Sequence, residues 1–183
     1  MFKEIINKRG YSLAEVIIAI GIFSIVSVIV SSVYLSANSL QQHTASLQRL
    51  QNEGRYIAEK ITREIRGREI DYSEVLKDDQ PQEYINFLKD EIGEEVKISL
   101  IDSNLEYDIG GGTSANLNAD DVDVVNAKFY IIPDEQGTWG LDPATNYQPR
   151  VTVLLELRSD PPNPKFQQSV ILQTTISSKV YKR

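Results

Sequence analysis

The feature that most constrains the fold is an apolar run from Leu13 to Leu35, in which Glu15 is the single charged residue. Because about 20 apolar residues in a helix cross the hydrocarbon core of a bilayer, this run predicts a transmembrane helix. The next cation after the run is Arg49. Three basic residues precede the run: Lys3, Lys8 and Arg9. By the positive-inside rule we expect a single-pass protein of the cytoplasmic membrane, with a cytoplasmic N-terminus and an extracytoplasmic head.

A cleaved secretory signal peptide is the main alternative for such a run. The apolar core of a signal peptide usually covers about 7 to 15 residues and ends at an A-x-A-like site. This run is longer, and its best candidate site, Leu35-Ser36-Ala37, fits that pattern poorly. A carboxylate at the centre of a spanning helix costs about 2.5 to 3.5 kcal/mol on insertion scales, so Glu15 is also unusual in a signal peptide. The pattern favours a helix that is retained.

Glu15 needs a cationic partner, because an unpaired carboxylate inside a membrane is costly. The apolar run contains no Lys, Arg or His. Cleavage after Gly10 would create a positive amine on Tyr11 at the membrane boundary. That amine would lie within reach of Glu15 on a neighbouring copy, so the pattern predicts a pairing between subunits.

The stretch "RGYSLAEVIIAIGIF" at residues 9–23 resembles the class III signal of type IV pilins and type II secretion pseudopilins. That signal combines a short basic leader, a glycine, an aromatic residue, the pattern Thr/Ser-Leu-x-Glu and an apolar helix. The resemblance implies that Gly10 precedes the prepilin peptidase cut, that Tyr11 becomes the N-methylated terminus and that Glu15 serves subunit assembly. Two departures stand out: Tyr11 replaces the more usual phenylalanine, and Ser32 stands where many major pilins carry proline.

The resemblance implies a structural role rather than catalysis, as a minor pilin or pseudopilin in a type IV pilus or type II secretion pseudopilus. The expected partners are other pilins or pseudopilins, in a homo- or hetero-filament, together with prepilin peptidase and the membrane. The chain's size, its lack of cysteine and its large β-rich head resemble J- or W-type minor pilins, and Glu15 separates it from K-type pseudopilins. The alternative is an uncleaved, signal-anchored extracytoplasmic binding domain with calcium as a candidate ligand.

Beyond Leu35 the apolar residues keep a helical spacing, and Gly67 predicts the helix stop. We expect one helix from about Tyr11 to Arg66. The apolar stripe comprises Leu40, Leu47, Leu50, Ile57, Ile61 and Ile65. Four segments follow: a leader at 1–10, a transmembrane helix at 11–35, its amphipathic continuation at 36–67 and a globular head at 68–183. His43 and Gly54 fall on or beside the stripe, and a single histidine predicts a structural role rather than a metal site.

The hydrophobic period changes after the helix, where β-rich runs alternate with turn-rich segments. Three segments rich in turn residues separate the runs, at 110–116, 133–149 and 160–165. The β-rich runs lie at 83–88, 95–101, 104–109, 122–132, 150–159 and 169–178. We therefore predict an α+β fold, in which the long N-terminal transmembrane and amphipathic helix packs on an antiparallel β-sheet head, as in the pilin fold.

Charge and cysteine content exclude several other functions. A net charge of −7 argues against direct nucleic-acid binding, which needs clustered cations. The cations between Arg49 and Arg68 alternate with carboxylates, in pairs such as Arg55/Glu59 and Glu59/Arg63, which predicts a solvated helix face. The absence of cysteine excludes disulfides, iron–sulfur clusters and thiolate zinc sites. We predict no cofactor.

Local motifs add little chemistry. The stretch "NLNADDVDVV" at 116–125 offers four weak calcium candidates: Asn118, Asp120, Asp121 and Asp123. It lacks the glycine and terminal glutamate of an EF-hand, so a solvated turn leading into a strand is favoured and no metal site is predicted. "GGG" at 110–112 opens no helix and predicts a hairpin loop. No Gly-x-Ser-x-Gly, His-Glu-x-x-His or Ser-x-x-Lys occurs, which argues against an enzyme. For Trp139 and Tyr147, packing is favoured over a contact surface.

Overall fold

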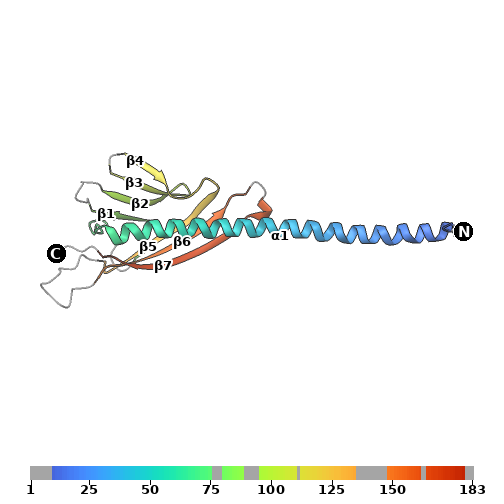
Figure 1. Ribbon diagram of the computed structural model, residues 1–183. Helices are drawn as coiled ribbons and strands as arrows, with labels where there is room; N and C mark the ends of the chain where they lie inside the picture. Colours follow the sequence, from blue (N-terminus) through green and yellow to red (C-terminus); the bar gives the residue numbers. More distant parts are fainter. Residues whose placement is uncertain are drawn as a thin grey trace, which may run out of the picture. The chain divides into compact units, whose positions relative to one another are not determined.

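The computed structural model describes residues 10–75, 80–88, 95–110, 112–134, 148–161 and 164–179. The chain divides into two compact units, Met1–Gln42 and His43–Arg183. Helix α1 (Leu13–Gly67) is 55 residues long and contributes to both units (Figure 1). It begins two residues after the predicted Tyr11 and ends one residue after the predicted Arg66, so the expectation of one long helix is confirmed.

In the first unit the apolar side chains of α1 are exposed. Ile18 is 62% exposed and Phe23 is 72% exposed, and the most apolar stretch of the helix contains no buried residue. By length and composition this part of α1 can cross a membrane. The serine hydroxyls here are satisfied within the helix, since those of Ser24, Ser31 and Ser36 each donate to the carbonyl four residues earlier at 2.8 to 2.9 Å. Such internal bonding is what a hydrocarbon environment requires.

The second unit contains two antiparallel sheets rather than a single one. In the first sheet the order is β1-β2-β3-β4. Its strands are β1 (Tyr84–Phe87), β2 (Val96–Ile101), β3 (Asn104–Ile109) and β4 (Thr113–Asn116). In the second sheet the order is β5-β6-β7. It comprises β5 (Val122–Ile132), β6 (Arg150–Ser159) and β7 (Ser169–Ser177), and the 3-10 helix η1 (Pro164–Phe166) precedes β7. The α+β class is confirmed, with the strands divided between two sheets.

Backbone hydrogen bonds join the two sheets along β5. The amide of Phe129 donates to the carbonyl of Gln82 at 2.8 Å, and the amide of Gln82 donates back to Phe129 at 3.0 Å. Farther along β5, the amide of Val124 donates to the carbonyl of Ser103, in the β2–β3 turn, at 2.9 Å. Gln82, just before β1, and Ser103, in the β2–β3 turn, therefore satisfy part of the edge of β5 and hold the sheets against each other.

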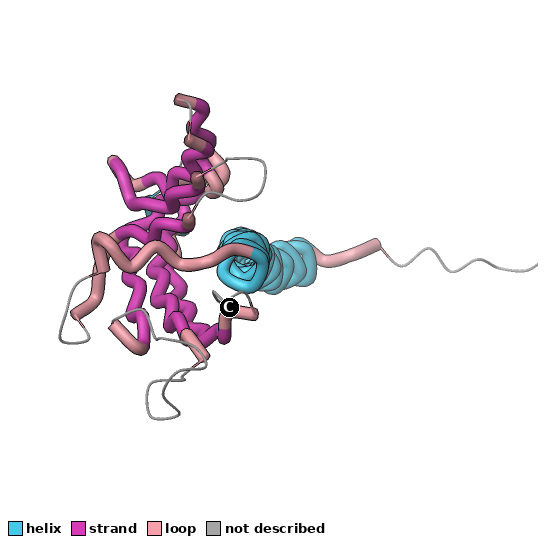
Figure 2. The backbone as a smooth tube through the Cα atoms, turned by 90° about the vertical axis from the view of Figure 1, so that its left-hand side faces the viewer, coloured by secondary structure: helices cyan, strands magenta, loops and turns pink. Residues whose placement is uncertain are grey.

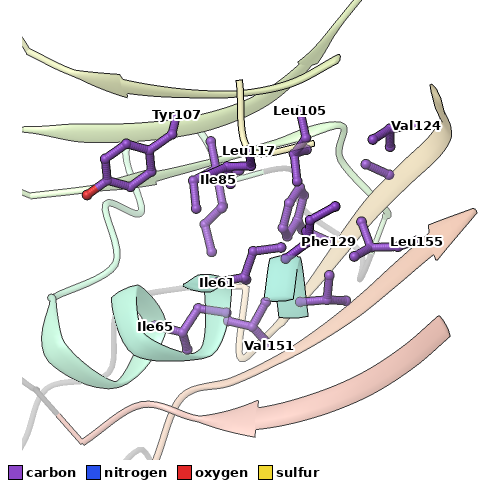
Figure 3. Close-up of a cluster of buried hydrophobic side chains, with 14 of the residues drawn as sticks. Ile61, Ile65, Ile85, Leu105, Tyr107, Leu117, Val124, Phe129, Val151 and Leu155 are labelled. Carbon is purple, nitrogen blue, oxygen red and sulfur yellow. The ribbon is translucent and has the colours of Figure 1, made fainter. Parts of the chain in front are cut away.

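The core of this unit lies between the two sheets and the C-terminal half of α1, with the strands to one side of the helix (Figure 2). Ile61 and Ile65 of α1 point toward Phe129 and Val151 (Figure 3). In the predicted helix stripe, Leu50, Ile57, Ile61 and Ile65 are fully buried. The prediction was wrong for the two earlier members, since Leu40 is 67% exposed and Leu47 is 36% exposed. The spacing of apolar residues identified the buried face of the helix but not how much of its length the sheets cover.

Gly54 brings α1 close to the second sheet. A Cβ atom at this position would overlap Cδ1 of Leu172 and lie 3.1 Å from Cδ1 of Leu157. Leu157 lies on β6 and Leu172 on β7, so the missing side chain lets two strands approach the helix surface. This explains a glycine in the middle of a helix, where it otherwise costs about 1 kcal/mol relative to alanine.

Strand β4 was missed by the sequence analysis, which treated residues 110–116 as a separator. It pairs with β3 from Ile109↔Thr113 to Glu106↔Asn116. Its residues are small and mostly polar, so the sequence shows no alternation of apolar and polar residues there that would predict a strand. Gly112 has φ of +88°, as the predicted hairpin loop requires. Trp139 and Tyr147 lie outside the described residues.

Candidate processing and assembly site

Ser12 and Glu15 form reciprocal hydrogen bonds at the start of α1. The Ser12 amide donates to Oε2 of Glu15 at 2.9 Å, and the Glu15 amide donates to Oγ of Ser12 at 3.3 Å. This capping box satisfies two amides that the first helical turn leaves without partners. It accounts for the helix start at Leu13, and it places the carboxylate at the positive end of the helix dipole.

The capping box was missed by the sequence analysis, although the signal was present. Residues 12–15 read Ser-Leu-Ala-Glu and stand directly before the apolar run, which is the pattern that predicts such a cap. Glu15 therefore has a local bond in the single chain as well as the assembly role that we expected. The structure gives no partner to its second oxygen, Oε1, among the residues it describes.

An open groove runs along one face of α1 beside Glu15. Its volume is about 510 Å³, and it is lined by Tyr11, Glu15, Val16, Ala19, Ile20 and Phe23. Among the described residues of this lining Glu15 is the only charged one, and Tyr11 at its end is 87% exposed. From residue 10 to residue 48 the sequence has no Lys or Arg, so this part of α1 offers the carboxylate no cationic side chain of that kind. The groove is an apolar surface with one negative charge in it.

The predicted cleavage position lies just ahead of this groove. Gly10 is exposed, and a Cβ atom built there would meet nothing within 4 Å. The backbone on either side of the Gly10–Tyr11 bond is therefore open in the single chain. Lys3, Lys8 and Arg9, predicted as the basic leader, lie outside the described residues.

Three of the four calcium candidates, Asn118, Asp121 and Asp123, make other contacts. The Asn118 side chain is buried, where its Oδ1 accepts from the Leu105 amide at 2.8 Å and its Nδ2 donates to the Val122 carbonyl at 2.7 Å. Asp121 pairs with Arg49, and Asp123 pairs with Arg158 at 2.9 Å. Among the described residues, no group of three or more His, Cys, Asp or Glu is arranged to hold a metal ion. These side chains fasten the turn before β5 to its surroundings.

Polar contacts also fix α1 to the turn before β5 and to the end of β6. Oε1 of Glu53 accepts from the Ala119 amide at 2.8 Å, and Oγ of Ser46 donates to Oγ of Ser159 at 2.9 Å. The expected solvated helix face therefore needs correction at Arg49 and Glu53, because both bind the turn before β5. The predicted Glu59/Arg63 pair is present, at 3.6 Å and largely exposed. Sequence spacing found pairs within the helix but not those made across the fold.

His43 has the structural role that we predicted. Its Nδ1 lies 3.2 Å from Nε2 of Gln168, and its ring meets Phe166 edge-on at 5.1 Å between centroids. Phe166 belongs to η1, so His43 connects α1 to the segment before β7. The ring is half-buried and has an amide partner, which is typical of a packing histidine.

Helix α1 has a capped start and a carboxylate in its first turn, and by length and composition its apolar part can serve as a membrane anchor. Residues 6–31 match the family model described as the prokaryotic N-terminal methylation motif. The chain carries this motif, and together with helix α1 it is consistent with a type IV pilin-like protein. Proteins with this motif are typically structural subunits that prepilin peptidase cleaves and that assemble with other pilins. No curated protein and no solved structure matches the chain.

Proposed function

We propose that the chain is a minor pilin or pseudopilin, cut after Gly10, N-methylated on Tyr11 and assembled into a type IV pilus or a type II secretion pseudopilus. The observation that carries the proposal is the position of Glu15, a lone carboxylate in an apolar groove at the start of an exposed helix that bears the methylation motif. A soluble subunit has no use for such a helix. A subunit that assembles through its helix needs both the apolar surface and a group that sets the register.

The proposed mechanism is association of apolar helices, with the Glu15 carboxylate neutralising the methylated amine of Tyr11 on an adjacent subunit. Before assembly, the capping box gives the carboxylate one hydrogen bond, and no other described residue bonds to Oε1. A cation that approaches Oε1 in a medium of low dielectric gains more than it would in water. Helices displaced from the matching register leave a charge unpaired, which is costly, so the pair selects register as well as adding affinity.

The proposed segments follow from this mechanism. Residues 1–10 form the leader, 11–35 the membrane-spanning helix, 36–67 its continuation and 68–183 the head, with the leader cytoplasmic and the head extracytoplasmic. The large head without cysteine supports a J- or W-type minor subunit. After processing, the subunit leaves the membrane for the filament.

The first test is intact-mass and N-terminal peptide mass spectrometry on the protein from its own membrane fraction. We expect a chain that begins at Tyr11 and carries about 14 Da from one added methyl group. A Gly10→Leu variant is the matched control, because it should keep the leader while the fold of the head is unchanged. A chain that still begins at Met1 where prepilin peptidase is active would leave the uncleaved, signal-anchored domain as the correct description.

A further inference from the structure

Strand β7 is the last strand of the second sheet, and its outer edge is open. Two backbone bonds continue its ladder to β6: the Ser178 amide donates to the Pro149 carbonyl and the Ser159 amide donates to the Gln168 carbonyl, both at 2.9 Å. Because backbone groups alternate between the two sides of an antiparallel strand, the even-numbered residues of β7 face β6 and the odd-numbered residues face outward. The outward-facing residues are all exposed: Ser169, Ile171, Gln173, Thr175 and Ser177. Among the described residues, their amides and carbonyls have no backbone partner.

The sequence of β7 does not protect this edge. Proteins usually guard an open edge with a charged residue, a proline or a bulge. The nine residues of β7, SVILQTTIS, contain no charge, no proline and no glycine, and the bulge of this sheet lies on β5 instead. Ile171 is 67% exposed, more than any other large apolar side chain described in the second unit. The edge is therefore suited to pairing with another strand.

Strand β4 has the other open edge in the described part of the two sheets. The amide of Asp71 bonds to the Asn86 carbonyl along β1 at 3.0 Å, while Gln82 and Ser103 bond to β5. The backbone of β4 pairs with β3 alone among the described residues. Its residues 114–116 are exposed and carry no charge. Figure 1 shows β4 and β7 on opposite sides of the second unit.

We propose that β4 of a second copy of the chain adds to the open edge of β7, so that the first sheet of one head continues the second sheet of the next. The proposal rests on the proposed function, since assembly through α1 must first bring copies together in one orientation. A contact along a four-residue strand is small. It forms between copies that their helices already hold close, because anchoring raises the effective concentration of each edge.

Strand direction and charge select this occupant. The bridge between Gln82 and Phe129 is antiparallel, so β1 runs opposite to β5. Since neighbouring strands alternate in both sheets, β4 and β7 run in the same direction. A copy in the same orientation therefore presents β4 parallel to β7, and the segment after β4 lies next to the end of β7. Asp120 follows β4, whereas Arg150 and Lys179 stand at that end of β7, and all three are exposed.

Pairing between two β7 strands is the main alternative. An antiparallel pair of identical strands has a two-fold axis, so it reverses the second copy together with the part of α1 that packs on its sheets. Helices that assemble side by side in one direction do not permit this reversal. Head-to-tail contact between two different edges keeps the orientation and repeats from copy to copy, as a filament requires.

Introduced thiols test the contact, because the chain contains no cysteine. Ser114→Cys and Gln173→Cys are placed in two differently tagged full-length copies, which are produced together with prepilin peptidase and the assembly machinery. After treatment with a short bismaleimide, we expect a crosslinked dimer that carries both tags. Ser99→Cys replaces Ser114→Cys in the control, since Ser99 lies on β2, two strands from the open edge, and should give no such dimer.

Three results of this experiment would overturn the proposal. A dimer of two Gln173→Cys copies would show that β7 pairs with itself. A crosslink from Gln173→Cys to a different protein alone would show that the edge has another partner. Absence of any crosslink in assembled filaments would show that the edge stays open.

Charge reversal tests the direction of the strands. Asp120→Lys in the Ser114→Cys copy places a cation near Arg150 and Lys179, and should lower the dimer yield by about twofold to fivefold. Lys179→Glu in the other copy should restore the yield. Asp102→Lys, at an exposed position in the β2–β3 turn, is the matched control and should change nothing. Equal yields from Asp120→Lys and Asp102→Lys would contradict the parallel arrangement.

N-terminal mass spectrometry on the same samples separates the two proposals. A chain that begins at Tyr11 and forms no crosslinked dimer would remove the edge contact and leave the pilin role intact. A chain that begins at Met1 and forms no dimer would remove both, because unprocessed copies would then not be brought together through their helices.

Discussion

Arg49 of α1 and Asp121, two residues after Ala119, form a two-point ion pair. Nε of Arg49 lies 2.6 Å from Oδ2 of Asp121, and Nη2 lies 2.8 Å from Oδ1. Glu53, one turn farther along α1, accepts from the Ala119 amide at 2.8 Å. Two side chains of the helix therefore bind the same turn: Arg49 pairs with the Asp121 carboxylate, and Glu53 accepts a hydrogen bond from the Ala119 amide. These two contacts fix the start of β5, which begins at Val122.

The Arg49–Asp121 pair should contribute little to stability and should respond to salt. The side chains are 63% and 41% exposed, so solvent screens the pair. Arg49→Met should lower the free energy of unfolding by about 0.5 to 1 kcal/mol at low ionic strength, and by less in about 1 M salt. Chemical denaturation of the full chain in detergent measures both values. Arg55→Met is the control on the same helix, and an equal loss there would show that the ion pair is not the cause.

Gly54 should tolerate no side chain. Gly54→Ala places a methyl group onto Leu172, and the overpacking should cost about 1 to 3 kcal/mol, more than the gain of about 1 kcal/mol in helix propensity. We expect a net loss in thermal stability of the second unit. Gly67→Ala is the matched control, because a Cβ at Gly67 meets nothing within 4 Å. If Gly54→Ala proved as stable as Gly67→Ala, the close approach of Leu172 would be refuted.

Tyr72 should make stability depend on alkaline pH. Burial of its ring, with a smaller effect from Glu69, raises the pKa of Tyr72 from 10.0 to about 12. Its hydroxyl is buried and has no hydrogen-bond partner among the described residues. Because the folded state holds this proton more tightly than the unfolded state, the contribution is fully present below about pH 10 and is lost between about pH 10 and pH 12.

Tyr72→Phe should remove that dependence. As pH rises from 9 to 11.5, the melting temperature of the wild type should fall more steeply than the melting temperature of this variant. Melting curves followed by circular dichroism, in a series of buffers at constant ionic strength, measure it. Tyr56→Phe, at an exposed position on α1, is the control and should follow the wild type. Parallel curves for Tyr72→Phe and wild type would show that Tyr72 is not responsible.

Glu15→Gln should separate the charge of this residue from its capping role. Glutamine keeps an oxygen that can accept from the Ser12 amide, so the helix start should persist. The negative charge is lost, and we expect filament yield to fall at least about tenfold while cleavage after Gly10 continues. Ser12→Ala makes the opposite change, since it keeps the charge and removes one cap, at about 0.5 to 2 kcal/mol. Filament recovery by shearing, normalised to processed subunit, distinguishes the two. Normal yield from Glu15→Gln would exclude a role for the charge.

The sequence predicted the local elements well because each has a local cause. The run from Leu13 to Leu35 is too apolar for anything but a membrane or a helix interface, and α1 follows from it. Strands β5 and β6 were predicted at their observed bounds because their alternating residues mark one buried face. Strand β4 has no such alternation, and it exists because β3 offers it an edge.

The sequence by itself determined a long N-terminal helix with one carboxylate near its start, a β-rich head and the methylation motif, since these depend on spacing and composition along the chain. The tertiary structure decided how the strands divide between two sheets, where the helix stripe begins to be buried, and which polar side chains meet. Arg49 and Asp121 are 72 positions apart, and Gly54 meets Leu172 across 118 positions. No pattern within a window of a helical turn or a strand contains such pairs, because they arise only when the whole core has packed.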